Sequence, residues 1–419
     1  MQVVERFKQL SRIARCSHFG GEMLEYLEDE AKRYGYGVHS DDAGNLLCVH
    51  EAARVTLQAH YDMVCIGRAP DIEIYEEEGW LKAKESTLGA DNGIAMAMML
   101  ELMAEGALVS CLFTADEEVG LLGARALELP LQEIPMLNLD SEAEGEVTIG
   151  CAGGVDIVAT KPLRFERSKR HCYRVEIGGL PGGHSGVDID KKIPNAIKEL
   201  AALLERERAD LVEIGGGERR NAIPKSAYAV IATEAPCGIE GAYPMGEREV
   251  SWISGSSKVV AMLHGFAHGV REMDERLGIV HSSINLALLA MEGEELRIQL
   301  SARAMAEQSL KALEAQSVAY FEGFGCRVRT EGFYAPWPPE ENPFALTVRE
   351  VYREACGSAD FSAIHAGLEC GVIKERYPAI DIASIGPNIV APHSTSEAVE
   401  IASAERIYGV VKGVIERLG

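Results

Sequence analysis

Three acidic side chains, Asp116, Glu117 and Glu118, follow closely after the apolar stretch LVSCLF. Like charges at the end of a buried strand repel one another and lose hydration, which is costly unless a cation neutralises them. The crowding of these acids therefore predicts a cation site at this strand end.

Imidazole and carboxylate side chains also occur at the ends of other predicted elements. His60 and Asp62 are two residues apart on one strand, so they share a face, and a carboxylate beside an imidazole commonly fixes the tautomer of a metal-binding His. Asp91 lies where a helix begins, Asp140 ends a later strand, and His393 lies on a late loop. One such residue alone is more often a surface or capping residue. Their joint placement predicts a mixed N/O metal site that suits zinc or manganese.

Strands and helices alternate along the first part of the chain and place these residues at strand ends. Helical spacing of apolar residues predicts two helices within residues 1–35, separated near SHFGG. The later elements are strands within 45–51 and 54–63, a hairpin over 72–85, a helix over 89–106 with Asp91 or Asn92 as N-cap and Gly106 as its stop, a strand over 107–118, a short helix over 121–129 and a strand over 135–142. This order predicts βαβ units with a parallel sheet, in which ligands bind at the carboxyl ends of the strands.

From about residue 170 the pattern changes to β-α-β-α-β-β-α. The segments are strands at 170–180 and 225–235, helices at 193–209 and 258–278, and a hairpin of strands at 284–293 and 295–304 before another helix. This series predicts an independent α+β layer inserted into the first domain. The chain returns at the proline cluster FYAPWPPEENP and closes with a strand, a loop and a helix. We therefore predict a discontinuous domain over 1–168 and 336–419, and an inserted domain over 169–335.

The composition of the chain excludes several classes of protein. Lys and Arg number 41 against 65 Asp and Glu, a formal charge of -24, so the surface should repel nucleic acid and anionic membranes. The amino terminus lacks the apolar region of a signal peptide, and the longest apolar run, IAMAMML, is too short to cross a bilayer. The ten cysteines contain no CxxC pair and suit reduced thiols. We expect a cytoplasmic protein without nucleic-acid or membrane partners.

Eight motifs, in order along the chain, carry a resemblance to a known family. They are LQAHYDMV, LGADNGIAMA, FTADEEVGLLGA, LNLDSEAEGEVTIGCAGG, GGLPGGHSGVDI, RRNAIP, IHAGLECG and IGPNIVAPHSTSEAVEI. Together they resemble metallopeptidase family M20, most closely its aminoacyl-histidine dipeptidase (peptidase D) branch. The resemblance implies an α/β fold, with a parallel-rich mixed sheet flanked by helices in a zinc-peptidase-like catalytic domain. It also implies an inserted α+β, ferredoxin-like domain that serves as lid and dimerisation domain.

The resemblance implies a site for two divalent metal ions, zinc first, with manganese or cobalt as alternatives. Asp91 would bridge both ions. Glu118 and His393 would complete one site, and His60 and Asp140 would complete the other.

Other residues of the same motifs would act beside the metal ligands. Glu117 would be the general base that deprotonates a metal-activated water and passes the proton to the leaving amine. Asp62 would hold His60 in orientation. The family also implies a non-proline cis peptide bond between Asp91 and Asn92.

The inserted domain contributes candidate substrate residues. By resemblance, His184 in GGHSG would help to stabilise the oxyanion, and Asn221 in RRNAIP would be a further polar contact. Arg303, on a predicted edge strand, is a candidate clamp for a substrate carboxylate, although a solvated strand arginine is an equally good interpretation. His365 and Glu369 match the motif IHAGLECG, with substrate recognition or packing as their roles. We take His365 as a substrate-binding candidate.

Several further residues are interpreted as structural. His264 and His268 are four apart in a predicted helix and share a face, but no third ligand is near in sequence, so packing is favoured over metal binding. Cys151 and Cys370 are expected to be small buried residues beside tight turns. The glycine-rich segments lack the Lys and the strand-to-helix frame of a phosphate-binding loop.

The motifs together indicate a cytoplasmic metallodipeptidase that hydrolyses dipeptides, Xaa-His dipeptides in particular, by a two-metal-activated hydroxide with Glu117 as general base. Two alternatives stay open: an amidohydrolase of the same fold that acts on N-acyl amino acids or other short peptides, and a metal-free binding protein on a relict peptidase fold. An unpaired β edge on the inserted domain would be covered by pairing in a two-fold dimer, which predicts a homodimer.

Overall fold

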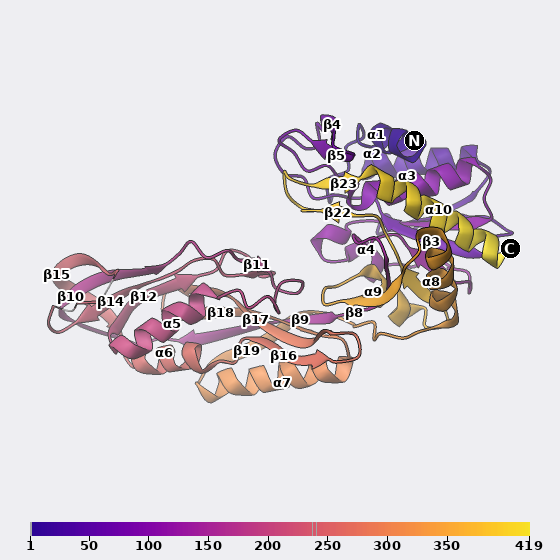
Figure 1. Cartoon of the computed structure of the whole chain (residues 1–419). Coiled ribbons are helices and arrows are strands. Elements are labelled where there is room, and N and C mark those ends of the chain that lie inside the picture. Colours follow the sequence, from indigo (N-terminus) through magenta and orange to yellow (C-terminus); the bar gives the residue numbers. More distant parts are fainter. Residues whose placement is uncertain (1, 237, 240) are drawn as a thin grey trace. The chain divides into compact units, whose positions relative to one another are not determined.

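The computed structural model describes residues 2–236, 238–239 and 241–419, and the chain forms two compact units (Figure 1). Unit 1 comprises Met1–Cys151, Trp337–Ala363 and Leu368–Gly419, and unit 2 comprises Ala152–Pro336 and Ile364–Gly367. Within the described residues, no helix has both the length and the apolar character needed to span a membrane.

Unit 1 is built on an eight-stranded mixed sheet. The strands, in spatial order, are β1 (Gly37–Ser40), β2 (Leu46–Val49), β6 (Val109–Thr114), β3 (Val55–His60), β7 (Met136–Asn138), β21 (Ile382–Ser384), β8 (Glu146–Cys151) and β20 (Asp360–Ile364). Strands β6, β3, β7 and β21 run parallel to their neighbours in this series, whereas β1, β2 and β8 pair antiparallel. The predicted parallel-rich mixed sheet is confirmed.

Helices cover both faces of this sheet. The helices α1 (Gln2–Leu10), α2 (Gly21–Arg33), α3 (Ala90–Ala104), α8 (Pro343–Cys356) and α10 (Ile401–Leu418) share one apolar core with it. Helix α3 contacts both α1 and the sheet and is therefore apolar on nearly all sides. The shorter α4 (Leu122–Arg125) and α9 (Glu369–Arg376) contact each other, and Glu369 of α9 reaches the opposite face of the sheet. A small sheet of β22 (Ile389–Val390), β23 (Ala398–Glu400), β5 (Trp80–Ala83) and β4 (Ile74–Glu77) completes unit 1.

Unit 2 is an antiparallel sheet covered by helices. Its strands, in spatial order, are β15 (Tyr243–Ile253), β10 (Phe165–Ile177), β14 (Ala227–Thr233), β12 (Asp210–Gly216), β17 (Ile279–Glu292), β18 (Glu295–Ala304), β9 (Gly153–Pro162) and β19 (Arg327–Tyr334), and β16 (Gly269–Asp274) also pairs with β17. The helices α5 (Ala196–Glu207), α6 (Ser256–Gly265) and α7 (Glu307–Gly323) belong to this unit (Figure 1). Their apolar residues are buried in one core with the sheet. A short ladder joins β11 (Gly183–His184) to β13 (Ala222–Ile223).

The structure corrects the predicted elements of this second unit. The unit begins at Ala152 rather than at residue 169, because β9 pairs with both β18 and β19. The predicted helix over 258–278 ends at Gly265, and the VREMD segment forms most of β16. His264 and His268 therefore do not share a helix face, and His268 instead accepts a hydrogen bond from the Leu286 N–H. Strand β18, which carries Arg303, lies inside the sheet and is not an edge.

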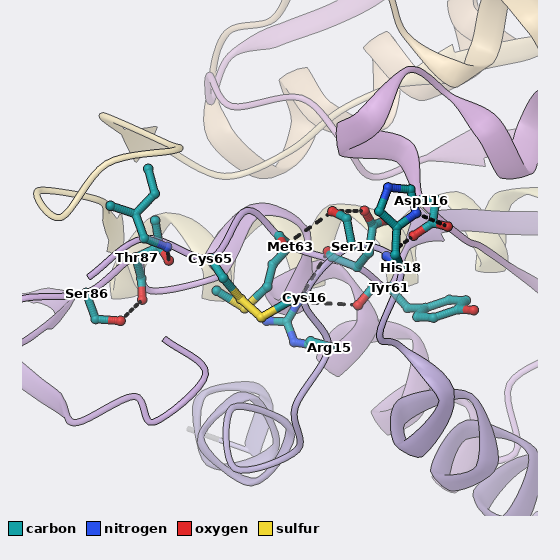
Figure 2. The surroundings of a disulfide bond; sticks show 12 residues. Arg15, Cys16, Ser17, His18, Tyr61, Met63, Cys65, Ser86, Thr87 and Asp116 are labelled. Carbon is teal, nitrogen blue, oxygen red and sulfur yellow. Dashed lines mark hydrogen bonds and ion pairs between the residues drawn. A yellow bond between two sulfur atoms is a disulfide. The ribbon is translucent and has the colours of Figure 1, made fainter. Parts of the chain in front are cut away.

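The expectation of reduced thiols is wrong for one pair of cysteines. Cys16 and Cys65 form a disulfide in unit 1 that joins the loop between α1 and α2 to the loop after β3 (Figure 2). Cys151 and Cys370 are buried free thiols, as expected, and burial raises the pKa of both. The amino-acid spacing could not indicate the bridge, because the two cysteines are 49 residues apart and meet only when the loops fold together.

We expect Leu57→Ala to destabilise unit 1. Leu57 is 0 % exposed in the core between β3 and its neighbours, so truncation should lower the free energy of unfolding by about 2 to 5 kcal/mol. Leu108→Ala is the control, because that side chain is 41 % exposed and its truncation should change stability by about 0.5 kcal/mol or less. Urea unfolding, read by amide hydrogen exchange in β3, measures both. Equal effects of the two substitutions would contradict this placement of the core.

Candidate metal centre

The parallel pairing of three strands brings their acidic and imidazole ends together. In β3 and β6, His60 lies opposite Thr114, so the acids that follow Thr114 are next to the His60 ring. In β3 and β7, Gln58 lies opposite Asn138, which brings Asp140 to the same edge. These side chains therefore lie at the carboxyl ends of parallel strands, which is where the sequence-based prediction put the site.

Asp91 lies between two imidazoles and contacts each with a different oxygen. Its Oδ1 is 3.0 Å from His60 Nε2, and its Oδ2 is 3.1 Å from His393 Nε2. His60 Nε2 is also 3.4 Å from Asp140 Oδ1, and His393 Nε2 is 2.8 Å from Glu118 Oε2. The five groups therefore form two overlapping sets, His60 with Asp140 and His393 with Glu118, with Asp91 common to both.

Glu117 belongs to the same cluster as these five groups. Ligand atoms of His60, Glu117 and Glu118 all lie within 4.8 Å of one another. The six residues that the sequence singled out as ligands or base thus converge in unit 1, although they come from five separate segments of the chain.

The electrostatics of the cluster show how strongly it needs positive charge. Burial raises the pKa of Glu117 well above its ordinary value, and the neighbouring Glu118 and Asp140 charges add to that rise. Burial and the Asp91 charge raise the pKa of Glu118 to about 7. Burial also opposes ionisation of Asp91, but hydrogen bonds from His393 and His60 outweigh it and hold the pKa of Asp91 below its usual range.

The donor set fits two divalent cations. Two imidazole nitrogens and three carboxylates form adjoining N/O sites of the type that zinc, manganese and cobalt occupy. Cations here would also neutralise carboxylates whose ionisation is opposed by burial. His60 and Asp140 could hold one ion, His393 and Glu118 the other, and Asp91 could bind both.

Asp62 organises the groups around His60. The His60 Nδ1 lies 3.1 Å from the Asp62 carbonyl oxygen and 3.4 Å from its carboxylate, so Nδ1 carries the proton and leaves Nε2 free to bind a cation. The Asp62 carboxylate accepts hydrogen bonds from the Glu117 N–H at 2.9 Å and from Ser17 Oγ at 2.7 Å. Asp62 therefore fixes the orientation of the ligand and the backbone of the predicted base.

The segment that carries Asp91 departs from the predicted start of helix α3. The peptide bond between Asp91 and Asn92 is cis, as the family resemblance implied. Both residues have non-helical backbone angles, and Gly89 rather than Asp91 or Asn92 is the N-cap. The Asn92 side chain is instead directed at the metal centre, where its Nδ2 donates to Asp140 Oδ1 at 2.6 Å.

Glu397 is a functional residue that sequence reasoning missed. Its buried carboxylate accepts hydrogen bonds from the N–H groups of four successive residues, at distances of 2.7 to 3.3 Å; these are Leu88, Gly89, Ala90 and Asp91. Glu397 therefore holds the backbone that positions Asp91. The signal available in the sequence was its position four residues after His393. The spacing of a carboxylate in a loop does not identify the groups with which it forms hydrogen bonds.

A chain of buried polar side chains runs across the sheet beneath the centre. Glu369 accepts from Gln58 at 2.6 Å and from Thr114 at 2.5 Å, and Asn138 donates to Gln58 at 2.5 Å. The same chain continues through Ser384, Ser141, Thr148 and Ser362. Glu369, whose role the sequence left open, therefore packs beneath the strand ends that carry His60 and Asp140. Burial raises the pKa of Glu369 to about 7.

In unit 2, His184 presents a defined tautomer. Its Nδ1 accepts hydrogen bonds from the N–H groups of Gly186 at 3.2 Å and Val187 at 3.1 Å. Because Nδ1 acts as an acceptor, a neutral His184 carries its proton on Nε2. The ring is therefore prepared to donate a hydrogen bond, which is the property that an oxyanion contact requires.

The other candidate substrate residues of unit 2 gather around Gly186. A Cβ atom at Gly186 would lie 2.3 Å from the His365 carbonyl oxygen and 3.2 Å from both Arg303 Nε and His184 Cε1, so only glycine fits between them. The Asn221 carbonyl oxygen accepts from the adjacent Ser185 N–H at 2.8 Å. The structure thus brings all four candidates into one small region of unit 2.

Arg303 is buried, which contradicts its interpretation as a solvated strand arginine. It is 9 % exposed, and its Nη1 donates to the Tyr334 hydroxyl at 2.7 Å. In the part of the chain that the structure describes, no carboxylate forms an ion pair with it, and its Nε has no hydrogen-bond partner. His365 contacts Ser283 Oγ at 2.7 Å, and burial together with the Arg303 charge lowers the pKa of His365 to about 3.

Comparison with known proteins assigns the sequence to a family. The profile described as Peptidase family M20/M25/M40 matches residues 56–417. The cytosol non-specific dipeptidase of Escherichia coli (strain K12) is 31 % identical over 468 residues, covering 98 % of this chain and 96 % of that protein. The structure of aminoacylhistidine dipeptidase from Vibrio alginolyticus superposes with a TM-score of 0.82 at 29 % identity, over 100 % of this chain and 96 % of that one. The aminopeptidase PepT from Bacillus cereus shares the fold at 16 % identity, with a TM-score of 0.62 over 100 % of this chain and 98 % of that one.

We expect Glu397→Gln to weaken metal binding. The amide can accept on one side only and would turn an N–H group toward the backbone donors, so the segment that carries Asp91 should lose its fixed position. The affinity of the metal-free protein for Zn²⁺ should fall about 10- to 100-fold, the usual size for a residue that orients a ligand. Zinc titration against a chelating dye measures this, with the exposed Glu416→Gln as the control. An unchanged zinc affinity would rule out this role for Glu397.

Proposed function

Because the chain belongs to peptidase family M20/M25/M40, we propose that it is a metal-dependent dipeptidase with a centre for two divalent cations. The single observation that carries this proposal is the position of Asp91, whose two carboxylate oxygens face His60 and His393 separately. Two adjoining cations require a ligand that can bind both of them, and the Asp91 carboxylate is placed to do so. The convergence of all six groups also speaks against a metal-free binding protein on a relict fold.

The residues of unit 1 divide into ligands and supports. His60 and Asp140 would hold one ion and His393 and Glu118 the other, with Asp91 available to both. Zn²⁺ would suit these donors, with Mn²⁺ or Co²⁺ as alternatives. When bound, the ions lower the pKa of a water molecule and polarise the substrate carbonyl. Asp62 and Glu397 fix the ligands through the contacts described above.

Glu117 is the general base of the proposed reaction. Its carboxylate is buried beside His60 and Glu118, and burial raises its pKa, so it binds a proton more tightly than an exposed carboxylate does. It takes a proton from the attacking water and passes that proton to the nitrogen of the leaving amine. Adjacent acids thus have different tasks, since Glu118 binds a cation and Glu117 handles the proton.

The residues of unit 2 supply substrate contacts in this proposal. Arg303 binds the carboxylate of the peptide, because a buried guanidinium that has no ionic partner among the described residues is ready for a bidentate anion. His184 donates a hydrogen bond from its Nε2–H group to the developing oxyanion, and Asn221 and His365 line the same region. A clamp for a free carboxylate favours dipeptides and other short peptides over long chains.

The names of the relatives suggest the substrate class and the compartment. A cytosol non-specific dipeptidase and an aminoacylhistidine dipeptidase both point to dipeptides, including Xaa-His, and the first also points to the cytoplasm. We propose the same for this chain, and a homodimer as its assembly. The test is turnover of a dipeptide library and of N-acyl amino acids with added Zn²⁺ or Mn²⁺. Activity confined to N-acyl amino acids would identify a deacylase instead.

We expect Glu117→Ala to bind metal normally and to lose about 100-fold or more in kcat, because the general base is removed while every ligand remains. Dipeptide hydrolysis and metal content are measured on the same preparation. Glu133→Ala serves as a control outside the centre. Near-normal turnover of Glu117→Ala would end its assignment as the base.

We expect Arg303→Lys to raise KM for dipeptides more than it lowers kcat. Lysine keeps the charge but loses the planar fork that binds a carboxylate at two points. A dipeptide amide, which lacks the carboxylate, should be hydrolysed equally by the variant and the parent. Steady-state kinetics on the paired substrates separate these effects, and a similar loss on both substrates would contradict a carboxylate clamp.

A further inference from the structure

The loop between α1 and α2 is attached to the metal centre at several points. We name residues 15–18 the anchor loop (Figure 2). Its Cys16 is joined to Cys65 by the disulfide and pairs with Met63 in a short parallel bridge. The Met63 N–H donates to the Arg15 carbonyl oxygen at 3.0 Å, and the Ser17 N–H donates to the Met63 carbonyl oxygen at 3.2 Å. The anchor loop therefore runs alongside the segment that follows His60.

Arg15 connects the anchor loop to the segment that carries Asp91. Its guanidinium is fully buried, and its Nη2 donates to the Gly89 carbonyl oxygen at 2.6 Å. Its Nη1 lies 3.5 Å from the carbonyl oxygens of both Tyr61 and Asp62. A Cβ atom at Gly89 would lie 2.6 Å from Arg15 Nη2, so the two segments pack without a gap. Arg15 thus holds Gly89 on one side while Glu397 holds the N–H groups of the same segment on the other.

Ser17 and His18 connect the anchor loop to Asp62 and to the acids after β6. Ser17 Oγ donates to Asp62 Oδ2 at 2.7 Å. The His18 N–H donates to Asp116 Oδ1 at 2.5 Å, and its Nδ1 lies 3.2 Å from Asp116 Oδ2 (Figure 2). Asp116 directly precedes Glu117 and has a left-handed backbone with φ of 49°. Three segments that carry the metal-site residues are therefore attached to one four-residue loop.

We propose that the anchor loop positions the metal centre, and that reduction of the Cys16–Cys65 disulfide by a dithiol releases the loop, weakens metal binding and lowers turnover. The turnover part rests on the function proposed above. In the exchange, the dithiol gives two electrons and two protons to the bridge. Cys16 and Cys65 become thiols, and the dithiol becomes a cyclic disulfide.

The disulfide is accessible to a reductant, and its reduction can change how firmly the anchor loop is held. Both cysteines are partly exposed, so a dithiol can reach the bridge, whereas six of the seven free cysteines among the described residues are buried. The anchor loop lies outside any helix, and a cross-link to the segment after β3 restricts the conformations that it can sample. Without the cross-link, the loop keeps the buried contacts of Arg15, whereas its other end depends on hydrogen bonds that include one from His18, whose side chain is 57 % exposed. Such exposed contacts hold a loop weakly.

The experiment compares oxidised and reduced protein without changing its sequence. Metal-free protein is treated with dithiothreitol under nitrogen, desalted and titrated with Zn²⁺ against a chelating dye, and its thiols are counted in parallel. We expect reduction to expose two additional thiols and to weaken zinc affinity about tenfold, with a similar fall in kcat/KM for a dipeptide. Reoxidation should restore both quantities.

Variants separate the bridge from other effects of the reductant. Cys65→Ser and Cys16→Ser should resemble the reduced protein and no longer respond to dithiothreitol. Cys356→Ser, which changes a partly exposed free cysteine, should respond as the parent does. Ser17→Ala keeps the bridge and loses the contact with Asp62, so it should bind zinc more weakly even when oxidised.

The outcomes distinguish this inference from the proposed function. Equal zinc affinity of the oxidised and reduced parent protein would overturn the inference, as would an unchanged thiol count after reduction. These two readings need no mutation, so a cysteine variant that fails to fold does not affect them. A redox-dependent zinc affinity without hydrolysis of any dipeptide in the oxidised state would instead overturn the proposed dipeptidase function and leave the positioning role of the loop supported.

Discussion

The structure of unit 1 depends on one electrostatic constraint, which is that several carboxylates are buried at the same edge of a sheet. Burial raises the pKa of Glu117, Glu118 and Asp140, so these groups resist ionisation unless positive charge is present. Two divalent cations would satisfy this requirement and would also supply the chemistry of the proposed hydrolase. The proposed function therefore accounts for the crowding of acids after β6, which would be destabilising in a protein without cations.

Buried hydrogen bonds keep the crowded groups in place. Beneath the centre, hydrogen bonds from Glu369 through Gln58 to Asn138 link neighbouring strands. Gln58 and Asn138 each lie two residues before a candidate ligand, His60 and Asp140. At the start of α3, Glu397 and Arg15 hold opposite sides of the backbone before Asp91. A ligand in such surroundings loses little freedom when a metal binds, and that preorganisation raises affinity.

In unit 2, local contacts also hold uncharged and cationic groups in fixed positions. His184 is fixed as a donor because two backbone N–H groups occupy its Nδ1. Arg303 is buried with a tyrosine hydroxyl but no carboxylate among the described residues, so an anionic ligand would complete its environment. The close packing around Gly186 explains why the motif GGHSG needs a residue without a side chain at that position.

The sequence by itself determined the mixed α/β sheet, the convergence of six acidic and imidazole groups at one edge of it, and the cis bond after Asp91, because strand periodicity, acids at strand ends and family motifs are local patterns along the chain. It missed β9 and β16 and placed Arg303 on an edge, because strand order depends on pairing between distant segments. Only the tertiary structure revealed the Cys16–Cys65 bridge and the positioning roles of Glu397, Arg15 and Gln58. Those contacts join residues up to hundreds of positions apart, and no local pattern encodes a partner at that distance.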